Sequence, residues 1–471
     1  MPIAINPEHQ ELADSVRALV ARIAPSETLH EAMETEVGNP PPYWQAAAEQ
    51  GLQGVHLAES VGGQGFGVLE LAIVLAEFGY GAVPGPFVPS AIASALISAH
   101  DPDAKALAGL ASGAEIAAYG LNCCALTATR QGSSLVIRGE LRAVPAAAQA
   151  SLLVLPVAID SGEAWVVLRA DQLEIEPVKS LDPLRPIADV RANAVEVGDD
   201  VVLTNLSMGT AHALMTTLLS AEAIGVARWA TDTASSYAKI REQFGRPIGQ
   251  FQAIKHKCAE MIADTERATA AVWDAARAID EARENRWDTA GSHVEFAAAV
   301  AATLAPAAAQ RCAQDCIQVH GGIGFTWEHD TNVYYRRALM LAASFGRSSD
   351  YPQRWSTPRP PPGCARSTST SIPRPRSCGR RSGPKWRRSR RSSASNARSP
   401  SPRAAGCCRT CPSRGAGRPG RWNRSSSRRS SPPGGSSGPR PASPPGSSRR
   451  SWRSAPRSKS SGSCRRPSAA R

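Results

Sequence analysis

Residues 316–330 read CIQVHGGIGFTWEHD, and residues 237–254 read YAKIREQFGRPIGQFQAI. Both stretches begin with apolar residues at helical spacing and then break at glycine or proline, so each is predicted to contain a helix end. The glycine pair in the first stretch lets backbone N–H groups approach a ligand closely. The arginine at the break in the second can hold a phosphate through two parallel hydrogen bonds. Both helix ends are therefore candidates for ligand contact.

Few side chains carry this chemistry. Arg241 is the candidate for phosphate binding, and Gln243 and Gln252 can donate hydrogen bonds to the same group. Gln318 can hydrogen-bond an anionic or ribityl oxygen, and the Gly321-Gly322 pair leaves the backbone accessible. Taken alone, the arginine stretch fits a solvated turn with ordinary surface charges about equally well, and a lone glycine pair is unspecific.

The rest of the body changes its periodicity twice along the chain. Residues 1–112 are predicted to form an N-terminal helical domain, because apolar residues such as Leu12 and Val16 recur at helical spacing. Residues 113–205 alternate, or run in short apolar blocks between glycines and prolines, which predicts a compact middle antiparallel β-domain. Helical spacing returns over residues 206–348. The fold class is therefore α+β, in the order helix, sheet, helix.

Residues 349–471 have a different composition. Residues 351–471 hold 30 of the 54 Lys and Arg residues and none of the 41 Asp and Glu residues, so residues 1–350 carry 24 basic against 41 acidic side chains. Because Arg, Ser, Pro and Gly dominate, this tail is predicted to be disordered. One interpretation is a basic arm that binds nucleic acid. We favour translation of a GC-rich gene out of frame, because acidic and nearly all large aliphatic residues vanish at one point, and then expect no nucleic-acid partner.

Compartment and metal content follow from simpler features. No apolar run reaches the roughly 18–20 residues that span a bilayer, and the first residues lack the basic and apolar regions of a signal peptide. We therefore expect no membrane association and a cytoplasmic location. Cys312 and Cys316 lie four residues apart on a predicted helix, but without a second ligand pair we interpret them as small buried residues.

Together with the order helix, sheet, helix, the two opening stretches resemble the acyl-CoA dehydrogenase family, in which R-x-x-F-G and Q-x-x-G-G-x-G-F recur at about this separation. The resemblance covers nearly all of residues 1–345, including the stretches 62–65 and 181–183. It implies an N-terminal helical domain, a middle β-domain and a C-terminal four-helix bundle, with self-association through the bundles. It also implies FAD bound between neighbouring units.

The resemblance assigns roles to the candidate residues. Arg241, Gln243 and Phe244 are expected at the adenine or pyrophosphate part of FAD, and so are Gln318 and the Gly321-Gly322 pair. The reaction that it implies is α,β-dehydrogenation of an acyl-CoA thioester, in which a carboxylate base removes the α-proton and the flavin accepts hydride from the β-carbon. Electron-transferring flavoprotein is the acceptor expected from the family.

The chain departs from the family where the base should stand. One family position for the base falls on Phe345 and the other on Met215, and neither side chain accepts a proton. Glu222 is the nearest carboxylate on the helix that carries Met215. We keep it as a candidate base, although a structural role is the preferred interpretation.

The middle domain departs as well, because the loop that usually faces the flavin ring is degenerate around residues 122–129 and 139–146. The pattern resembles bacterial dehydrogenases built as unlike pairs, including fused two-unit chains of steroid side-chain breakdown. An alternative function is therefore a catalytically inactive unit that completes the FAD site of another dehydrogenase unit, in a homo- or hetero-oligomer.

The frameshift hypothesis is tested by translating the gene beyond codon 350 in the other two frames. We expect one frame to give the start of a second helical dehydrogenase unit. If neither frame does so, the hypothesis fails.

Overall fold

The structure is a computed structural model. It describes residues 5–35, 40–121, 125–160, 162–285 and 291–345. The predicted disorder and altered reading frame of residues 349–471 lie outside the described residues, as does the stretch 122–124 of the degenerate loop.

The N-terminal part is helical, as predicted. Its helices are α1 (Pro7–Ile23), α2 (Ser26–Glu34), α3 (Trp44–Glu49), α4 (Val68–Tyr80), α5 (Phe87–His100) and α6 (Ala106–Ala111). Asn6 starts α1 with a capping box, because its side chain accepts from the His9 N–H while the His9 ring accepts from the Asn6 N–H. Helices α4 and α5 are buried on nearly all sides, which makes them core helices rather than surface helices.

A seven-stranded sheet follows within the described residues. Its strands are β1 (Ala117–Tyr119), β2 (Leu126–Gln131), β3 (Ser134–Pro145), β4 (Leu152–Ile159), β5 (Gly162–Arg169), β6 (Glu174–Val178) and β7 (Ile187–Val197). They lie in the order β1-β4-β2-β3-β7-β6, and β5 pairs with β4. The sheet encloses an apolar core of its own, which includes Ile137, Leu155 and Val190.

The prediction of a purely antiparallel sheet is wrong in two places. Strand β4 runs parallel to both β1 and β2, whereas the β2–β3, β3–β7, β4–β5 and β6–β7 pairs are antiparallel. Strand β3 turns the chain back after β2, so that β4 enters the sheet in the same direction as β2. Alternation of apolar residues reports which face a side chain occupies and not the direction of the neighbouring strand.

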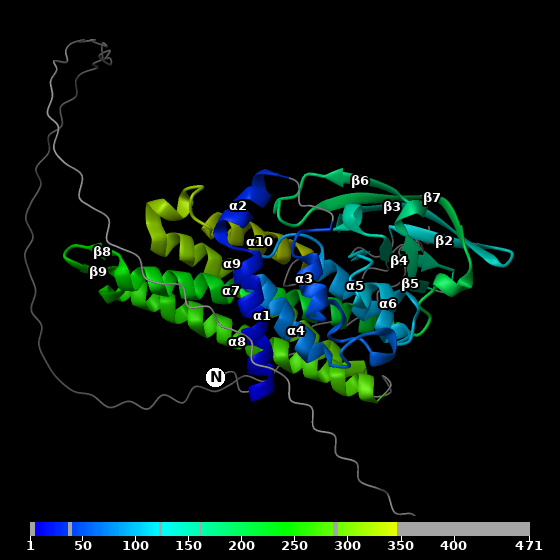
Figure 1. The fold of residues 1–471 in the computed structure, drawn as a ribbon, viewed down its shortest axis with the longest axis horizontal. Helices are drawn as coiled ribbons and strands as arrows, with labels where there is room; N and C mark the ends of the chain where they lie inside the picture. The colour runs from blue at the N-terminus through cyan, green and yellow to red at the C-terminus, as the bar shows by residue number, and fades with distance from the viewer. Residues whose placement is uncertain (1–4, 36–39, 122–124, 161, 286–290, 346–471) are drawn as a thin grey trace, which may run out of the picture. The chain divides into compact units, whose positions relative to one another are not determined.

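Long helices return after the sheet. They are α7 (Met208–Ile240), α8 (Gln252–Glu284), α9 (Gly291–His320) and α10 (Thr331–Phe345). Helix α7 packs on α8, α9 and α10, and it also packs on α4 and α5 of the N-terminal part. A small hairpin, β8 (Glu242–Gln243) with β9 (Arg246–Pro247), joins α7 to α8 at the end of the bundle away from the sheet (Figure 1).

Helices α4 and α7 are in backbone contact. A Cβ added at Gly225 would lie 2.0 Å from the carbonyl oxygen of Ala76, and one added at Gly79 would lie 2.1 Å from that of Glu222. Only glycine allows this approach, because any side chain would push the two helices apart. The contact fixes the position of α7 along its axis relative to α4, at the turn that carries Glu222.

Gly225→Ala is expected to lower the free energy of unfolding by about 2 kcal/mol or more, because the new methyl group meets backbone atoms that cannot rotate away. Urea denaturation followed by circular dichroism measures the change. Gly322→Ala is the matched control, since a Cβ there meets nothing within 4 Å. Equal stability of the two variants would contradict the close-contact argument.

Candidate functional site

The hairpin between α7 and α8 carries the first candidate segment. Helix α7 ends at Ile240, and Gln243 pairs with Arg246 across the hairpin. Phe244 and Gly245 form its tip with φ angles of 53° and 78°, the left-handed pair that a tight two-residue turn requires. The Phe244 side chain is 92% exposed. The turn thus holds the Phe244 ring in solvent, where it meets only the edge of the Phe251 ring among the described residues, with 6.0 Å between ring centroids.

The second candidate segment lies where α9 ends. His320 is the last residue of α9, and Gly321 adopts φ 65°, which ends the helix in the manner typical of glycine. Residues Gly321–Phe325 then form a short 3-10 turn. A Cβ at Gly321 or at Gly322 would meet nothing within 4 Å, so the backbone of the pair faces open space.

The fold brings these two segments together. The Tyr237 ring, one turn before Arg241, stacks on the His320 ring with 4.2 Å between ring centroids and 26° between planes. Residues more than eighty positions apart in the sequence are therefore neighbours at one end of the bundle. The adjacency was expected only from the family resemblance, because neither stretch alone specifies its partner.

The exposed donors at this end fit an anionic ligand. Arg241, Gln252 and Gln318 are exposed, and none of them has a side-chain hydrogen bond or ion pair within the described part of the chain. The side-chain nitrogen of Gln243 donates to the Glu242 carbonyl at 2.9 Å. A free guanidinium group, free amides and an open glycine turn match the phosphates and ribityl or ribose oxygens of FAD. The individual contacts stay predictions.

Both family positions for the base lie in the apolar core. The Met215 side chain on α7 is 2% exposed, and the Phe345 side chain at the end of α10 is 4% exposed. Glu222 lies two turns beyond Met215 on the same face of α7 and is completely buried.

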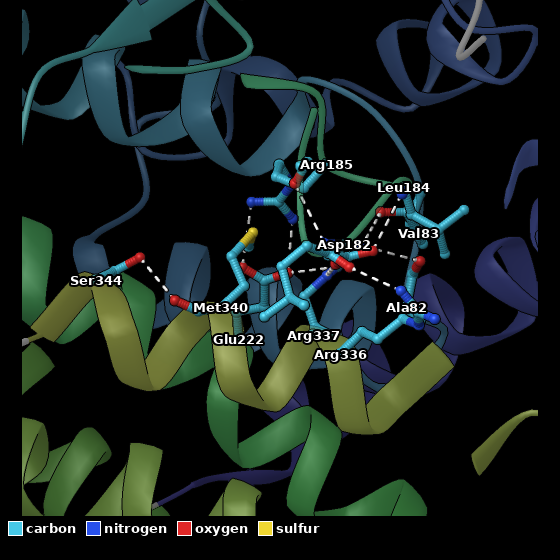
Figure 2. A network of polar contacts seen from close by, with 12 residues as sticks. Ala82, Val83, Asp182, Leu184, Arg185, Glu222, Arg336, Arg337, Met340 and Ser344 are labelled. Carbon is cyan, nitrogen blue, oxygen red and sulfur yellow. Dashed lines mark hydrogen bonds and ion pairs between the residues drawn. The ribbon is translucent and has the colours of Figure 1, made fainter. Parts of the chain in front are cut away.

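Glu222 belongs to a buried ionic network (Figure 2). Its Oε1 accepts from Arg185 Nη2 at 2.6 Å and from Arg337 Nη1 at 2.7 Å. Arg337 also pairs with Asp182 and donates to the carbonyl oxygens of Ala82 and Val83 at 3.4 and 3.5 Å. The network therefore joins α7, α10, the loop that precedes β7 and the loop between α4 and α5.

The electrostatics of this network disfavour Glu222 as a base. Burial alone would raise the pKa of the carboxyl group, but the guanidinium groups of Arg185 and Arg337 outweigh it and hold the pKa below its usual range. The carboxylate is ionised, hydrogen-bonded and out of reach of solvent. The structure thus favours the structural interpretation of Glu222.

Sequence reasoning missed the partners of Glu222. Asp182 lies in the family-like stretch 181–183, but no local pattern pairs it with Arg337. A signal was present: an acid in the apolar face of a helix needs a buried cation, and α10 carries two adjacent arginines near apolar residues.

The cysteines and the character of the helices are two further features of the described residues. Cys312 and Cys316 are buried, as predicted, and burial raises the pKa of the Cys316 thiol to about 12. Across the described residues, no three or more His, Cys, Asp or Glu side chains are grouped so that they could hold a metal ion. In the same part of the chain, no helix has both the length and the apolar character needed to cross a membrane.

Comparisons with known proteins decide the family. The family models described as acyl-CoA dehydrogenase N-terminal and C-terminal domains match residues 6–114 and 208–349. Acyl-CoA dehydrogenase IpdE2 of Mycobacterium tuberculosis is 32% identical over 333 residues, which cover 70% of this chain and 91% of IpdE2. The chain belongs to the acyl-CoA dehydrogenase family. The predicted fold class and the order helix, sheet, helix are confirmed, and the family is FAD-dependent.

Two further acyl-CoA dehydrogenase comparisons bear on the extent of the match. FadE34 of Mycobacterium tuberculosis is 37% identical over 313 residues, which cover 66% of this chain but only 41% of FadE34. The chain thus spans less than half the length of that relative. The solved structure of the Tcur3481-Tcur3483 steroid ACAD G363A variant has a TM-score of 0.67 at 25% identity, and covers 74% of this chain and 96% of its own.

Glu222→Gln is expected to lower the free energy of unfolding by about 3–5 kcal/mol at neutral pH, because two buried guanidinium groups lose an ionised partner. Because the folded-state pKa of Glu222 is lowered, its stabilisation is present above the usual glutamate range and disappears as the pH falls through the lowered value. Denaturation at several pH values should therefore show the difference between wild type and variant shrinking in acid.

The matched control is Asp199→Asn, which neutralises an exposed carboxylate 2.7 Å from Arg130 and should change stability little. If Glu222→Gln behaved like this control, the ionic network would not be what holds these elements together.

Proposed function

We propose that this chain binds the adenine and pyrophosphate end of FAD within an assembly that dehydrogenates an acyl-CoA thioester between its α and β carbons. The observation that carries the proposal is the meeting of the uncommitted Arg241 and Gln318 side chains with the open Gly321-Gly322 turn at one end of the bundle. In this family, bound FAD supplies the acceptor for the hydride that leaves the β-carbon.

Each residue of the site has a definite task in this proposal. The Arg241 guanidinium group would hold the pyrophosphate through two parallel charge-assisted hydrogen bonds. The N–H groups of the Gly321-Gly322 turn approach the same anion without a side chain in the way. Gln243, Gln252 and Gln318 would donate to the remaining oxygens, and the exposed Phe244 ring would contact the adenine or pyrophosphate part.

Exposed apolar side chains support assembly at this end. Ile240, Phe244 and Phe325 are 77%, 92% and 78% exposed, and they come from the end of α7, the hairpin tip and the 3-10 turn. Large apolar side chains gathered in solvent beside a polar site are typical of an interface. We therefore propose a homo- or hetero-oligomer formed through the helical bundle, with FAD shared between neighbouring units.

A second candidate function is that of a partner unit without a base of its own. Met215 and Phe345 are apolar and buried, and Glu222 is enclosed by two guanidinium groups, so none of the three can take a proton from a substrate. The base would then come from another unit. The two-component steroid ACAD and the greater length of FadE34 are compatible with such a unit. A steroid-derived acyl-CoA, electron-transferring flavoprotein as acceptor and a cytoplasmic location are the corresponding proposals.

The full chain should be purified and its flavin absorbance recorded before and after addition of an acyl-CoA. We expect bound FAD in the wild type, and Arg241→Ala should weaken FAD binding by about tenfold to a hundredfold, because a charge-assisted hydrogen-bond pair is lost. Arg22→Ala, which removes an exposed arginine in the last turn of α1, is the control and should bind FAD normally.

The outcome separates the two candidates. Bleaching of the flavin by acyl-CoA would establish activity of this chain and exclude the partner-unit function, whereas bound but unbleached FAD would favour it. Equal FAD binding by wild type and Arg241→Ala would contradict the assignment of Arg241.

A further inference from the structure

Three aromatic rings, those of Tyr237, His320 and His329, are in contact where the two candidate segments meet. Tyr237 of α7 stacks on His320 of α9, and His320 lies against His329 with 4.4 Å between ring centroids. Tyr237 precedes Arg241 by one turn, and His320 precedes the Gly321-Gly322 pair directly. The two histidines therefore lie where the candidate segments meet, although neither has been assigned a contact with the cofactor.

His320 is held in its neutral form. It is 5% exposed, and its Nδ1 lies 2.8 Å from the Cys316 carbonyl oxygen, so Nδ1 carries the proton of the neutral ring. A second proton would have to enter on Nε2, beside the rings of Tyr237 and His329. Burial lowers the pKa of His320, and the neighbouring His329 lowers it further, whereas the bond to Cys316 acts against both.

A different contact favours the neutral form of the His329 ring. Its Nδ1 accepts from the Thr331 N–H at 3.2 Å, and Thr331 is the first residue of α10. A proton on this nitrogen would turn the acceptor into a donor that faces another N–H group. The N-terminus of a helix also disfavours a positive charge. Burial lowers the pKa of His329, and Asp330 opposes this effect.

The other charged groups around the segment come from α2 and from the segment itself. His30 and Ser26 both bind Oδ1 of Asp330, at 2.9 and 2.6 Å, and the edge of His30 meets Trp327 with 5.7 Å between ring centroids. Glu328 is the remaining acid of the segment. These contacts tie Asp330 to α2 independently of His329.

We propose that His329 is a positioning residue that holds residues 321–330 in place only while its ring is neutral, so that the cofactor-binding end loosens in mild acid. The coupling to cofactor rests on the proposed function, whereas the loosening concerns this chain alone. Both histidines titrate below the usual histidine range, so the segment is fully held above about pH 6.5. Stability is lost as the pH falls from there through the lowered values, because the unfolded chain then binds more protons.

Hydrogen exchange on the full chain without cofactor tests the loosening. Between about pH 7.5 and about pH 5.5, wild-type amides of residues 321–335 should lose protection by about threefold to tenfold after correction for intrinsic exchange. His329→Asn keeps an oxygen that accepts from the Thr331 N–H and cannot be protonated, so its protection should not change. If wild type and His329→Asn respond alike, the proposal is overturned. His329→Gln replaces the asparagine variant if that variant fails to fold.

Two further measurements complete the test. His30→Gln should retain the acid response, and loss of the response in this variant would transfer the effect to His30 and overturn the role of His329. The FAD dissociation constant should rise by about threefold to tenfold over the same pH range in wild type but not in His329→Asn. An FAD dissociation constant that does not change with pH in wild type would contradict the coupling between the loosening and cofactor binding. Absence of FAD binding at either pH counts against the proposed function instead, and hydrogen exchange alone then decides the role of His329.

Discussion

The structure depends on one buried group of charges, in which the Glu222 carboxylate lies between the guanidinium groups of Arg185 and Arg337. Asp182 completes the group, so two positive and two negative charges balance without solvent. These residues come from the bundle and from the loop between β6 and β7 of the sheet, and Arg337 reaches two carbonyl groups of the N-terminal part. Apolar packing tolerates small sliding movements, but an ion pair of this geometry does not, so the network sets the register between three parts of the fold.

The surroundings of the candidate base positions follow from the same packing. On α7, the face that carries Met215 continues to Glu222 and meets α4 at Gly79. On α10, the face that carries Arg337 continues to the buried Phe345. The sides of both helices that could have presented a carboxylate to a substrate are used for packing. The exposed chemistry lies instead at the far end of the bundle, around Arg241 and Gln318.

Much of the fold could be predicted from the sequence, because apolar spacing reports which face of an element is buried. The direction of β4 could not be predicted, because the alternation of apolar residues along a strand is the same whether its neighbours run parallel or antiparallel to it. At the candidate site, glycine and proline marked the helix ends near Arg241 and Gly321 correctly. The stack of Tyr237 on His320 and the pairing of Asp182 with Arg337 stayed hidden, because contacts across more than eighty residues leave no local pattern.

The hairpin tip has a consequence for handling the isolated protein. Phe244 takes a left-handed backbone angle, which costs free energy for a bulky residue. In this conformation its apolar ring is exposed to water. A single copy in dilute solution therefore exposes an apolar side chain at the hairpin that favours association. Its solubility, its tendency to self-associate on concentration and its loss on storage depend on whether another surface covers that ring.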